Sequence, residues 1–234
     1  MKNIDYLKGL TIAHRGIYDN IEVPENSFLS FLLAKKEKLP IELDVRYTKD
    51  KKLVIFHDNN LYRMTGINKK VNKSTFDEIK NFSLAKTKYK IPLLEDILSL
   101  INGNVLLNLE IKEKNTDICL ELVKILDNYN GTFIISSFYP NIISWFRKNR
   151  PNYIIGLIVG LDFSSRFGIF DYCKADFIAI SKKQVKFKKI QKKRNAGTII
   201  LTWTIQNKEE LLEYSDYSDS FIANIKPNHL FIKH

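Results

Sequence analysis

Three carboxylates interrupt apolar runs of the sequence, where a strand with only a structural role would carry apolar residues. Glu42 and Asp44 lie two positions apart in the apolar run 40–45, and Glu110 lies in the similar run 105–112. Residues at i and i+2 share one face of a strand, so Glu42 and Asp44 can point the same way. Carboxylates that converge without a cation repel one another and are costly to desolvate, so the pattern indicates a hard divalent metal. Oxygen ligands without thiolates favour Ca²⁺ or Mg²⁺, with Mn²⁺ also suitable.

Two histidines and two basic side chains accompany these carboxylates. His14 and Arg15 lie at the end of the first apolar run of the chain, and His57 and Lys112 end two later runs. A phosphodiester needs an acid for its leaving oxygen and a base for its nucleophile, and imidazole titrates in the right range for both. Arg15 offers a planar fork for phosphate oxygens, and Lys112 adds a point charge. We therefore predict metal-assisted phosphodiester chemistry; the alternative is that the carboxylates only form salt bridges with Arg15 and Lys112.

Eight apolar, β-rich runs alternate with helical patterns and predict the elements that position these side chains. The runs are 10–16, 40–45, 105–112, 132–138, 153–160, 176–181, 198–205 and 220–225. Strands that alternate with helices form parallel sheets, and eight of them in 234 residues favour an α/β fold, the (β/α)₈ TIM barrel. In such barrels the active site lies at the C-terminal ends of the strands, where the candidate residues fall. The simplest interpretation is a single domain spanning 1–234.

A ninth apolar run, 53–57, needs a different place. About four residues separate it from the preceding run, too few for the dozen or more of a parallel crossover. It is therefore predicted to be the second leg of a hairpin that returns His57 to about the level of Asp44. The segment 46–90 then becomes a small insertion after the second strand, and 91–101 supplies the second helix of the barrel.

The basic charge of the chain is concentrated in one segment. The net charge is +11, and residues 182–194 hold eight Lys or Arg and no acid, which leaves +3 for the rest. A surface helix with a lysine-rich face explains this segment, and contact with an anionic membrane or another polyanion is the alternative. Because the excess is local, no nucleic-acid partner is predicted, and nothing in the sequence indicates an oligomeric state.

The sequence shows no pattern typical of a membrane span, a signal peptide or a disulfide framework. No apolar run approaches the roughly 18 residues of a membrane span, and the N-terminus lacks a signal-peptide pattern, so a cytoplasmic location is expected. Cys119 and Cys173 have neither disulfide-framework nor zinc-site spacing, and we expect both to be core thiols.

Several short motifs add a family resemblance. They are AHRG at 13–16, PENS at 24–27, ELDVRYTKDKKLVIFHD at 42–58, LNLEIK at 107–112 and TWTIQN at 202–207. Their order and spacing resemble the glycerophosphodiester phosphodiesterases, within the phospholipase C-like (PLC-like) phosphodiesterase superfamily. The resemblance implies metal-dependent hydrolysis of glycerophosphodiesters to sn-glycerol 3-phosphate and an alcohol. It also implies that the glycerol 2-hydroxyl attacks first and gives a cyclic phosphate on the way.

Position by position, the resemblance implies a role for each candidate residue. The catalytic acid and base are His14 and His57, the metal ligands are Glu42, Asp44 and Glu110, and the phosphate contacts are Arg15 and Lys112. Ser137 is expected near the substrate, and Trp203 is expected to form an apolar wall, with a packed barrel residue as the alternative. Glu25 and Asn26 would support the mouth. Asn224 stands where Asp is frequent, and Asp58 either orients His57 or caps the insertion.

Two other functions stay open at this point. One is a lysophospholipase D-like or other PLC-like phosphodiesterase that acts at anionic membranes and docks through 182–194. The other is a non-catalytic polyanion-binding barrel, against which the complete set of candidate histidines and carboxylates argues. The head group of the substrate and the native metal cannot be predicted from these motifs.

Overall fold

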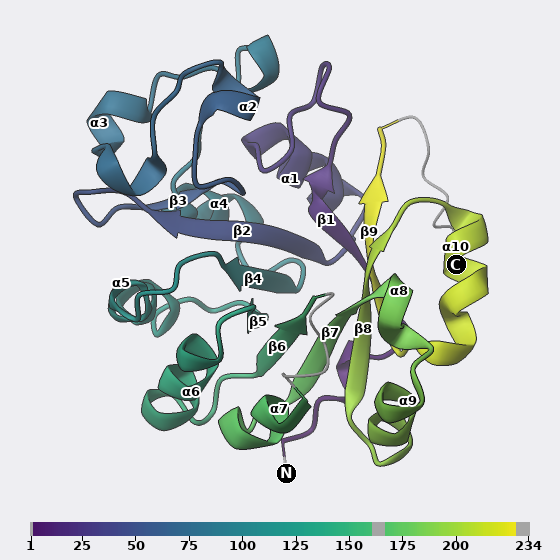
Figure 1. The fold of residues 1–234 in the computed structure, drawn as a ribbon. Helices are drawn as coiled ribbons and strands as arrows, with labels where there is room; N and C mark the ends of the chain where they lie inside the picture. Colours follow the sequence, from purple (N-terminus) through teal and green to yellow (C-terminus); the bar gives the residue numbers. More distant parts are fainter. Residues whose placement is uncertain (1, 161–166, 228–234) are drawn as a thin grey trace.

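The computed structural model describes residues 2–160 and 167–227, and these contain a barrel of parallel strands (Figure 1). Its strands are β1 (Thr11–Ile17), β2 (Ile41–Tyr47), β4 (Leu107–Ile111), β5 (Phe133–Ser137), β6 (Ile155–Val159), β7 (Phe177–Ser181), β8 (Ile199–Ile205) and β9 (Ser220–Ile225). They pair in the order β1-β9-β8-β7-β6-β5-β4-β2, and a further β1–β2 pairing closes the ring. The predicted (β/α)₈ barrel is therefore confirmed.

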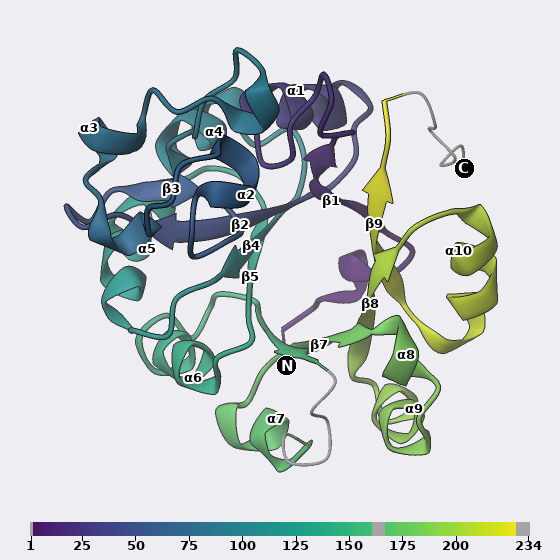
Figure 2. The ribbon, with the colours of Figure 1, turned by 45° about the horizontal axis from the view of Figure 1, so that its top comes forward.

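Helices between the strands form the outer layer of the barrel (Figure 2). They are α1 (Phe28–Lys36), α4 (Leu94–Ile101), α5 (Asp117–Leu126), α6 (Pro140–Asn149), α7 (Phe167–Cys173), α8 (Lys182–Val185), α9 (Lys188–Asn195) and α10 (Lys208–Tyr214), followed by the 3₁₀ turn η4 (Ser215–Tyr217). The main core lies between these helices and the outer faces of the strands, and it includes the buried free thiols of Cys119 and Cys173, as expected. The lysine-rich segment forms two short helices, α8 and α9, instead of the one helix predicted.

A second core fills the barrel interior beneath the strand ends. It contains Ile12, Phe177 and Leu201, together with Leu7 from the short 3₁₀ helix η1 (Asp5–Leu7). Figure 2 shows this N-terminal segment crossing the middle of the ring of strands. Leu7 therefore packs into the interior core beneath the candidate residues, which lie at the opposite, C-terminal ends of the strands.

The predicted hairpin is present between β2 and the antiparallel strand β3 (Leu53–Ile55). The N–H of Phe56 donates to the carbonyl of Asp44 at 2.9 Å, so the chain returns to the level of Asp44 just before His57. The next elements are α2 (Tyr62–Thr65), η2 (Val71–Lys73), α3 (Phe76–Ile79) and η3 (Leu84–Lys86), which enclose a small apolar core of their own. After them α4 takes the place of the second barrel helix, within the predicted segment 91–101.

Candidate active site

Three carboxylates from two adjacent strands meet at the C-terminal end of the barrel. The register of β2 and β4 pairs Glu42 with Asn108 and Asp44 with Glu110. One oxygen each from Glu42, Asp44 and Glu110 lies within 4.8 Å of the others. Among the described residues, Glu42 Oε1 and Asp44 Oδ1 are buried without a hydrogen-bond partner. Lys112 Nζ lies 3.5 Å from Asp44 Oδ1 and offsets only part of the cost of burying these oxygens, so the donor set fits a divalent cation that prefers oxygen ligands.

The pKa shifts of these carboxylates also fit a cation site. Burial, together with the charges of Asp44 and Glu110, holds the pKa of Glu42 well above its ordinary value. Burial also raises the pKa of Glu110. Burial opposes ionisation of Asp44 too, but Lys112 and Arg15 outweigh it and hold the pKa of that carboxyl well below its usual range. Both burial and the neighbouring carboxylates therefore oppose the ionisation of Glu42.

Arg15 is held beside the carboxylates by an irregular turn of β1. Its φ of 56° lies in the left-handed region, and its N–H donates to Glu42 Oε2 at 3.0 Å. Gly16 follows with a φ of 82°, and a Cβ there would lie 2.7 Å from atoms of α1. The Arg15 guanidinium is fixed by Glu25 at 2.7 Å and by Asp44 at 3.2 Å. Strained backbone of this kind persists only where its surroundings hold it, so the position of Arg15 is tightly defined.

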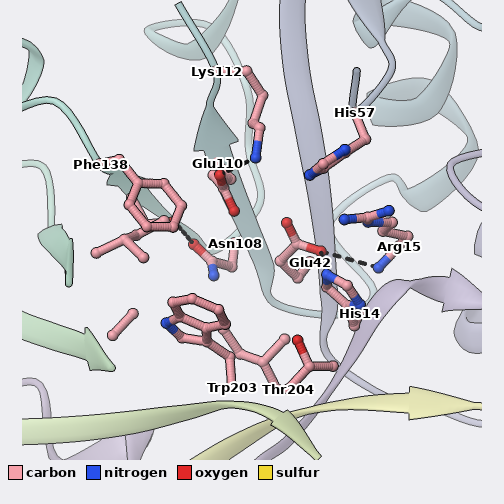
Figure 3. Close-up of a pocket in the computed structure, with 14 residues that line it drawn as sticks. His14, Arg15, Glu42, His57, Asn108, Glu110, Lys112, Phe138, Trp203 and Thr204 are labelled. Atoms are coloured by element: carbon pink, nitrogen blue, oxygen red, sulfur yellow. Dashed lines mark hydrogen bonds and ion pairs between the residues drawn. The ribbon is translucent and has the colours of Figure 1, made fainter. Parts of the chain in front are cut away.

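The two histidines reach the same pocket from different elements (Figure 3). His14 lies in β1, with Nδ1 2.6 Å from Asn224 Oδ1 and Nε2 3.9 Å from Glu42 Oε2. His57 follows β3, and its Nδ1 lies 2.6 Å from Asp58 Oδ1. Since Nδ1 is engaged in both rings, Nε2 is the nitrogen left for chemistry. Burial lowers the pKa of His14 to about 4 and also lowers the pKa of His57.

Two arginines that sequence reasoning missed join the insertion to the barrel. Arg63 of α2 pairs with Asp58 at 2.6 Å and with Glu25 at 2.7 Å. Arg46 of β2 donates from Nε and Nη2 to the carbonyl of His57 at 2.9 and 2.8 Å. Both residues therefore fix the position of His57 relative to the carboxylates. Their roles depend on the path of the hairpin, which no single motif in the sequence indicates.

The pocket has a polar and an apolar side and a volume of about 120 Å³. Its apolar side is formed by Phe138, Ile158, Ala179, Trp203 and Ile222. The rings of Phe138 and Trp203 meet edge to face at 5.8 Å, so Trp203 lines the pocket as well as packing in the barrel. Ser136 faces the pocket, whereas the predicted Ser137 donates to the carbonyl of Ile111 at 2.8 Å. Successive residues of a strand face opposite sides, which accounts for the shift of one position.

The basic segment 182–194 is partly neutralised by acids on neighbouring elements. Four of its cations form ion pairs: Lys182 with Glu210, Lys186 with Glu213, Lys193 with Asp171 and Arg194 with Asp219. The other four, Lys183, Lys188, Lys189 and Lys192, are exposed. Across residues 2–160 and 167–227, no helix is long and apolar enough to cross a membrane.

Comparison with known proteins places this site in a family. Residues 14–218 match the family described as Glycerophosphoryl diester phosphodiesterase. The chain belongs to this family. The matched range contains every residue predicted above to bind metal, to bind substrate or to transfer a proton, so the resemblance found in the motifs is confirmed as a family relationship.

Individual members of the glycerophosphoryl diester phosphodiesterase family extend the comparison. A glycerophosphodiester phosphodiesterase of Caldanaerobacter subterraneus is 36% identical over 166 residues, which cover 65% of this chain and 67% of that protein. One from Bacillus altitudinis is 31% identical over 158 residues, or 60% of this chain and 62% of that protein. The chain thus matches about two thirds of the length of these relatives.

Solved structures show the shared fold over nearly the whole chain. A phosphodiesterase of Oleispira antarctica, solved in complex with the product sn-glycerol-3-phosphate, has a TM-score of 0.85 at 23% identity and covers 94% of each chain. The Thermotoga maritima glycerophosphodiester phosphodiesterase has a TM-score of 0.75 at 21% identity, covering 92% of this chain and 94% of its own. At these identities the likeness concerns the barrel alone.

Proposed function

We propose that this protein hydrolyses glycerophosphodiesters to sn-glycerol 3-phosphate and an alcohol, with a bound divalent cation and two catalytic histidines. The observation that carries the proposal is the cluster of Glu42, Asp44 and Glu110, whose oxygens lie within 4.8 Å of one another in the same site as His14 and His57. The family relationship supports the reaction class. The product named for the Oleispira antarctica structure supports the glycerol phosphate part of the substrate.

Glu42, Asp44 and Glu110 would hold the cation, and Ca²⁺, Mg²⁺ and Mn²⁺ all suit their oxygens. The bound cation would supply positive charge where negative charge develops on the phosphate. Arg15 and Lys112 border the same space and would bind the non-bridging phosphate oxygens, Arg15 through its planar fork. Because Arg15 pairs with Asp44 and Lys112 pairs with Glu110, the phosphate would lie beside these pairs and against the bound cation.

The two histidines would divide the proton transfers between them. One Nε2 takes the proton of the glycerol 2-hydroxyl, whose oxygen forms a bond to phosphorus as the bond to the alcohol breaks. The other, protonated histidine gives its proton to the departing alcohol oxygen. A water molecule then opens the cyclic phosphate with the two roles exchanged, which leaves sn-glycerol 3-phosphate and restores both histidines.

The test is turnover of glycerophosphocholine and glycerophosphoethanolamine by the purified protein with Ca²⁺, Mg²⁺ or Mn²⁺, followed as release of glycerol 3-phosphate. Release that requires a divalent ion supports the proposal, and no release with any of these ions refutes it. His14→Ala and His57→Ala should each remove turnover while the melting temperature stays close to that of the wild type. A wild-type rate in either variant would contradict the acid and base roles.

Action at an anionic membrane stays a second proposal, since the basic segment keeps exposed lysines beside its ion pairs. If it operates, co-sedimentation with vesicles should increase with their anionic lipid content and decrease with salt. Charge reversal of Lys188 and Lys189 should weaken that binding. Vesicle binding that depends on neither lipid charge nor salt would contradict this second proposal and would indicate that 182–194 is only a solvated surface.

A further inference from the structure

Asn108 is a buried polar residue of the pocket that the roles above do not use. It lies on β4 two positions before Glu110 and is the register partner of Glu42, so its side chain is on the barrel face that carries the carboxylates. The residue is 1% exposed, yet it lines the pocket. A polar side chain in such a place needs hydrogen-bond partners at both ends of its amide.

Ser136 determines which end of the Asn108 amide faces the pocket. The Ser136 hydroxyl, on the neighbouring strand β5, donates to Asn108 Oδ1 at 2.8 Å. Figure 3 shows the amide nitrogen turned toward Trp203. In the described ranges, Asn108 Nδ2 donates to no side-chain or backbone oxygen.

The surroundings of Asn108 Nδ2 define what can satisfy it. The pocket wall opposite is apolar and consists of the rings of Phe138 and Trp203 with Ile222. A bound group there must bring an oxygen for the amide N–H and carbon atoms for the rings. A glycerol unit has both, because its hydroxyl oxygen accepts a hydrogen bond while its carbon chain packs on the Trp203 ring.

We infer that Asn108 is a further substrate-binding residue, which donates from Nδ2 to a hydroxyl of the glycerol group, and that Ser136 is the residue that positions it. The inference rests on the proposed function and deepens it. It makes the pocket selective for phosphate esters of a polyol over esters of a plain alkyl alcohol, because a polyol places a hydroxyl acceptor at this N–H, whereas an alkyl chain would cover the N–H and exclude water from it.

The experiment compares two ligands that differ in their hydroxyls. Calorimetric titration with Mg²⁺ present gives the affinities for sn-glycerol 3-phosphate and for n-propyl phosphate, which has the same carbon number without the hydroxyls. The wild type should prefer the first ligand. Asn108→Leu should reduce this preference roughly 10- to 100-fold and leave the affinity for propyl phosphate nearly unchanged. Ser136→Ala should reduce it by a smaller factor, because the amide is then free to turn.

Asn104→Leu is the matched control, since Asn104 is exposed before β4 and donates to the carbonyl of Ile101. It should keep the wild-type affinities. An unchanged preference in a folded Asn108→Leu protein overturns the inference, as does equal affinity of the wild type for both ligands. If Asn108→Leu does not fold, Ser136→Ala with an unchanged preference overturns it.

An assay of turnover distinguishes a failure of this inference from a failure of the proposed function. If the protein releases glycerol 3-phosphate but Asn108→Leu has the same ligand preference as the wild type, only the inference is refuted. A preference that depends on Asn108 without any turnover refutes the proposed function alone.

Discussion

Glu42→Gln removes one charge from the three carboxylates and separates cation binding from folding. Their oxygens lie within 4.8 Å of one another, and at an effective dielectric constant of about 20 two unit charges at that distance repel by roughly 3.5 kcal/mol. The positive charges of Arg15 and Lys112 offset part of this repulsion. Gln can still accept the N–H of Arg15, so without divalent ions the variant should melt at or above the wild-type temperature.

With a divalent ion present, the wild type should instead melt at a higher temperature than Glu42→Gln. A cation at 100 times its dissociation constant stabilises the folded state by about 2.7 kcal/mol. For a domain of this size that corresponds to a rise in melting temperature of roughly 5–10 °C. The wild type should show this rise with Mg²⁺, Ca²⁺ or Mn²⁺ and lose it with a chelator, whereas Glu42→Gln should show little of it. Glu37→Gln, at an exposed position after α1, is the control and should follow the wild type.

Scanning calorimetry with and without each ion gives both quantities. A Glu42→Gln protein that melts well below the wild type in the absence of ions would refute the reasoning, because Glu42 would then stabilise the fold by itself. An ion-induced rise equal to that of the wild type would refute its role as a ligand. Because burial and the neighbouring carboxylates favour the protonated form of Glu42, cation binding should also release protons, measurable by titration in buffers of different ionisation enthalpy.

Three further predictions concern the residues around the carboxylates. Asn224→Leu removes the oxygen that accepts from His14 Nδ1 and should lower kcat roughly 10- to 100-fold with little change in melting temperature, while Asn224→Asp should retain most activity in steady-state assays. Arg46→Met leaves the buried carboxylate of Glu113, 2.8 Å from Nη1, without its partner, and should cost about 3–5 kcal/mol of unfolding free energy in denaturant titrations. Burial lowers the pKa of His14 from 6.5 to about 4, so between these values the unfolded chain binds more protons. Stability should therefore fall by about 3 kcal/mol as the pH is lowered through that window, and His14→Gln should remove this part of the pH dependence.

The barrel and the centre of its site followed from local rules. Alternating strands and helices imply a parallel sheet, and parallel strands bring all their carboxyl ends to one rim. That rule alone placed His14, Glu42, Asp44 and Glu110 near one another. The hairpin followed from loop length, because about four residues cannot make a parallel crossover.

Other features depend on register and on distant segments, which local patterns do not contain. The serine pair in SSF offers two hydroxyls, and only the pairing of Ser136 with Glu110 shows that Ser136 faces the interior. The sequence of 182–194 predicts a surface helix with a lysine-rich face and does not indicate which acids pair with it. Its partners Glu210 and Glu213 lie more than 20 residues further along the chain, on α10, so only the ion pairs of Lys182 and Lys186 with that helix show the neutralisation.

His14 and His57, the two catalytic candidates, are held in place by different parts of the chain. His14 belongs to a barrel strand and lies beside the carboxylates through the β1–β2 pairing itself, in which it is the register partner of Glu42. His57 comes from outside the barrel, and its place depends on the Phe56–Asp44 backbone bond and on the arginines that cross from the barrel to the insertion. The proposed cation binding by residues of β2 and β4 therefore depends only on the barrel, whereas the proposed proton transfer by His57 also requires the insertion to be docked. A change confined to the contacts of the insertion should alter turnover without altering the affinity for the cation.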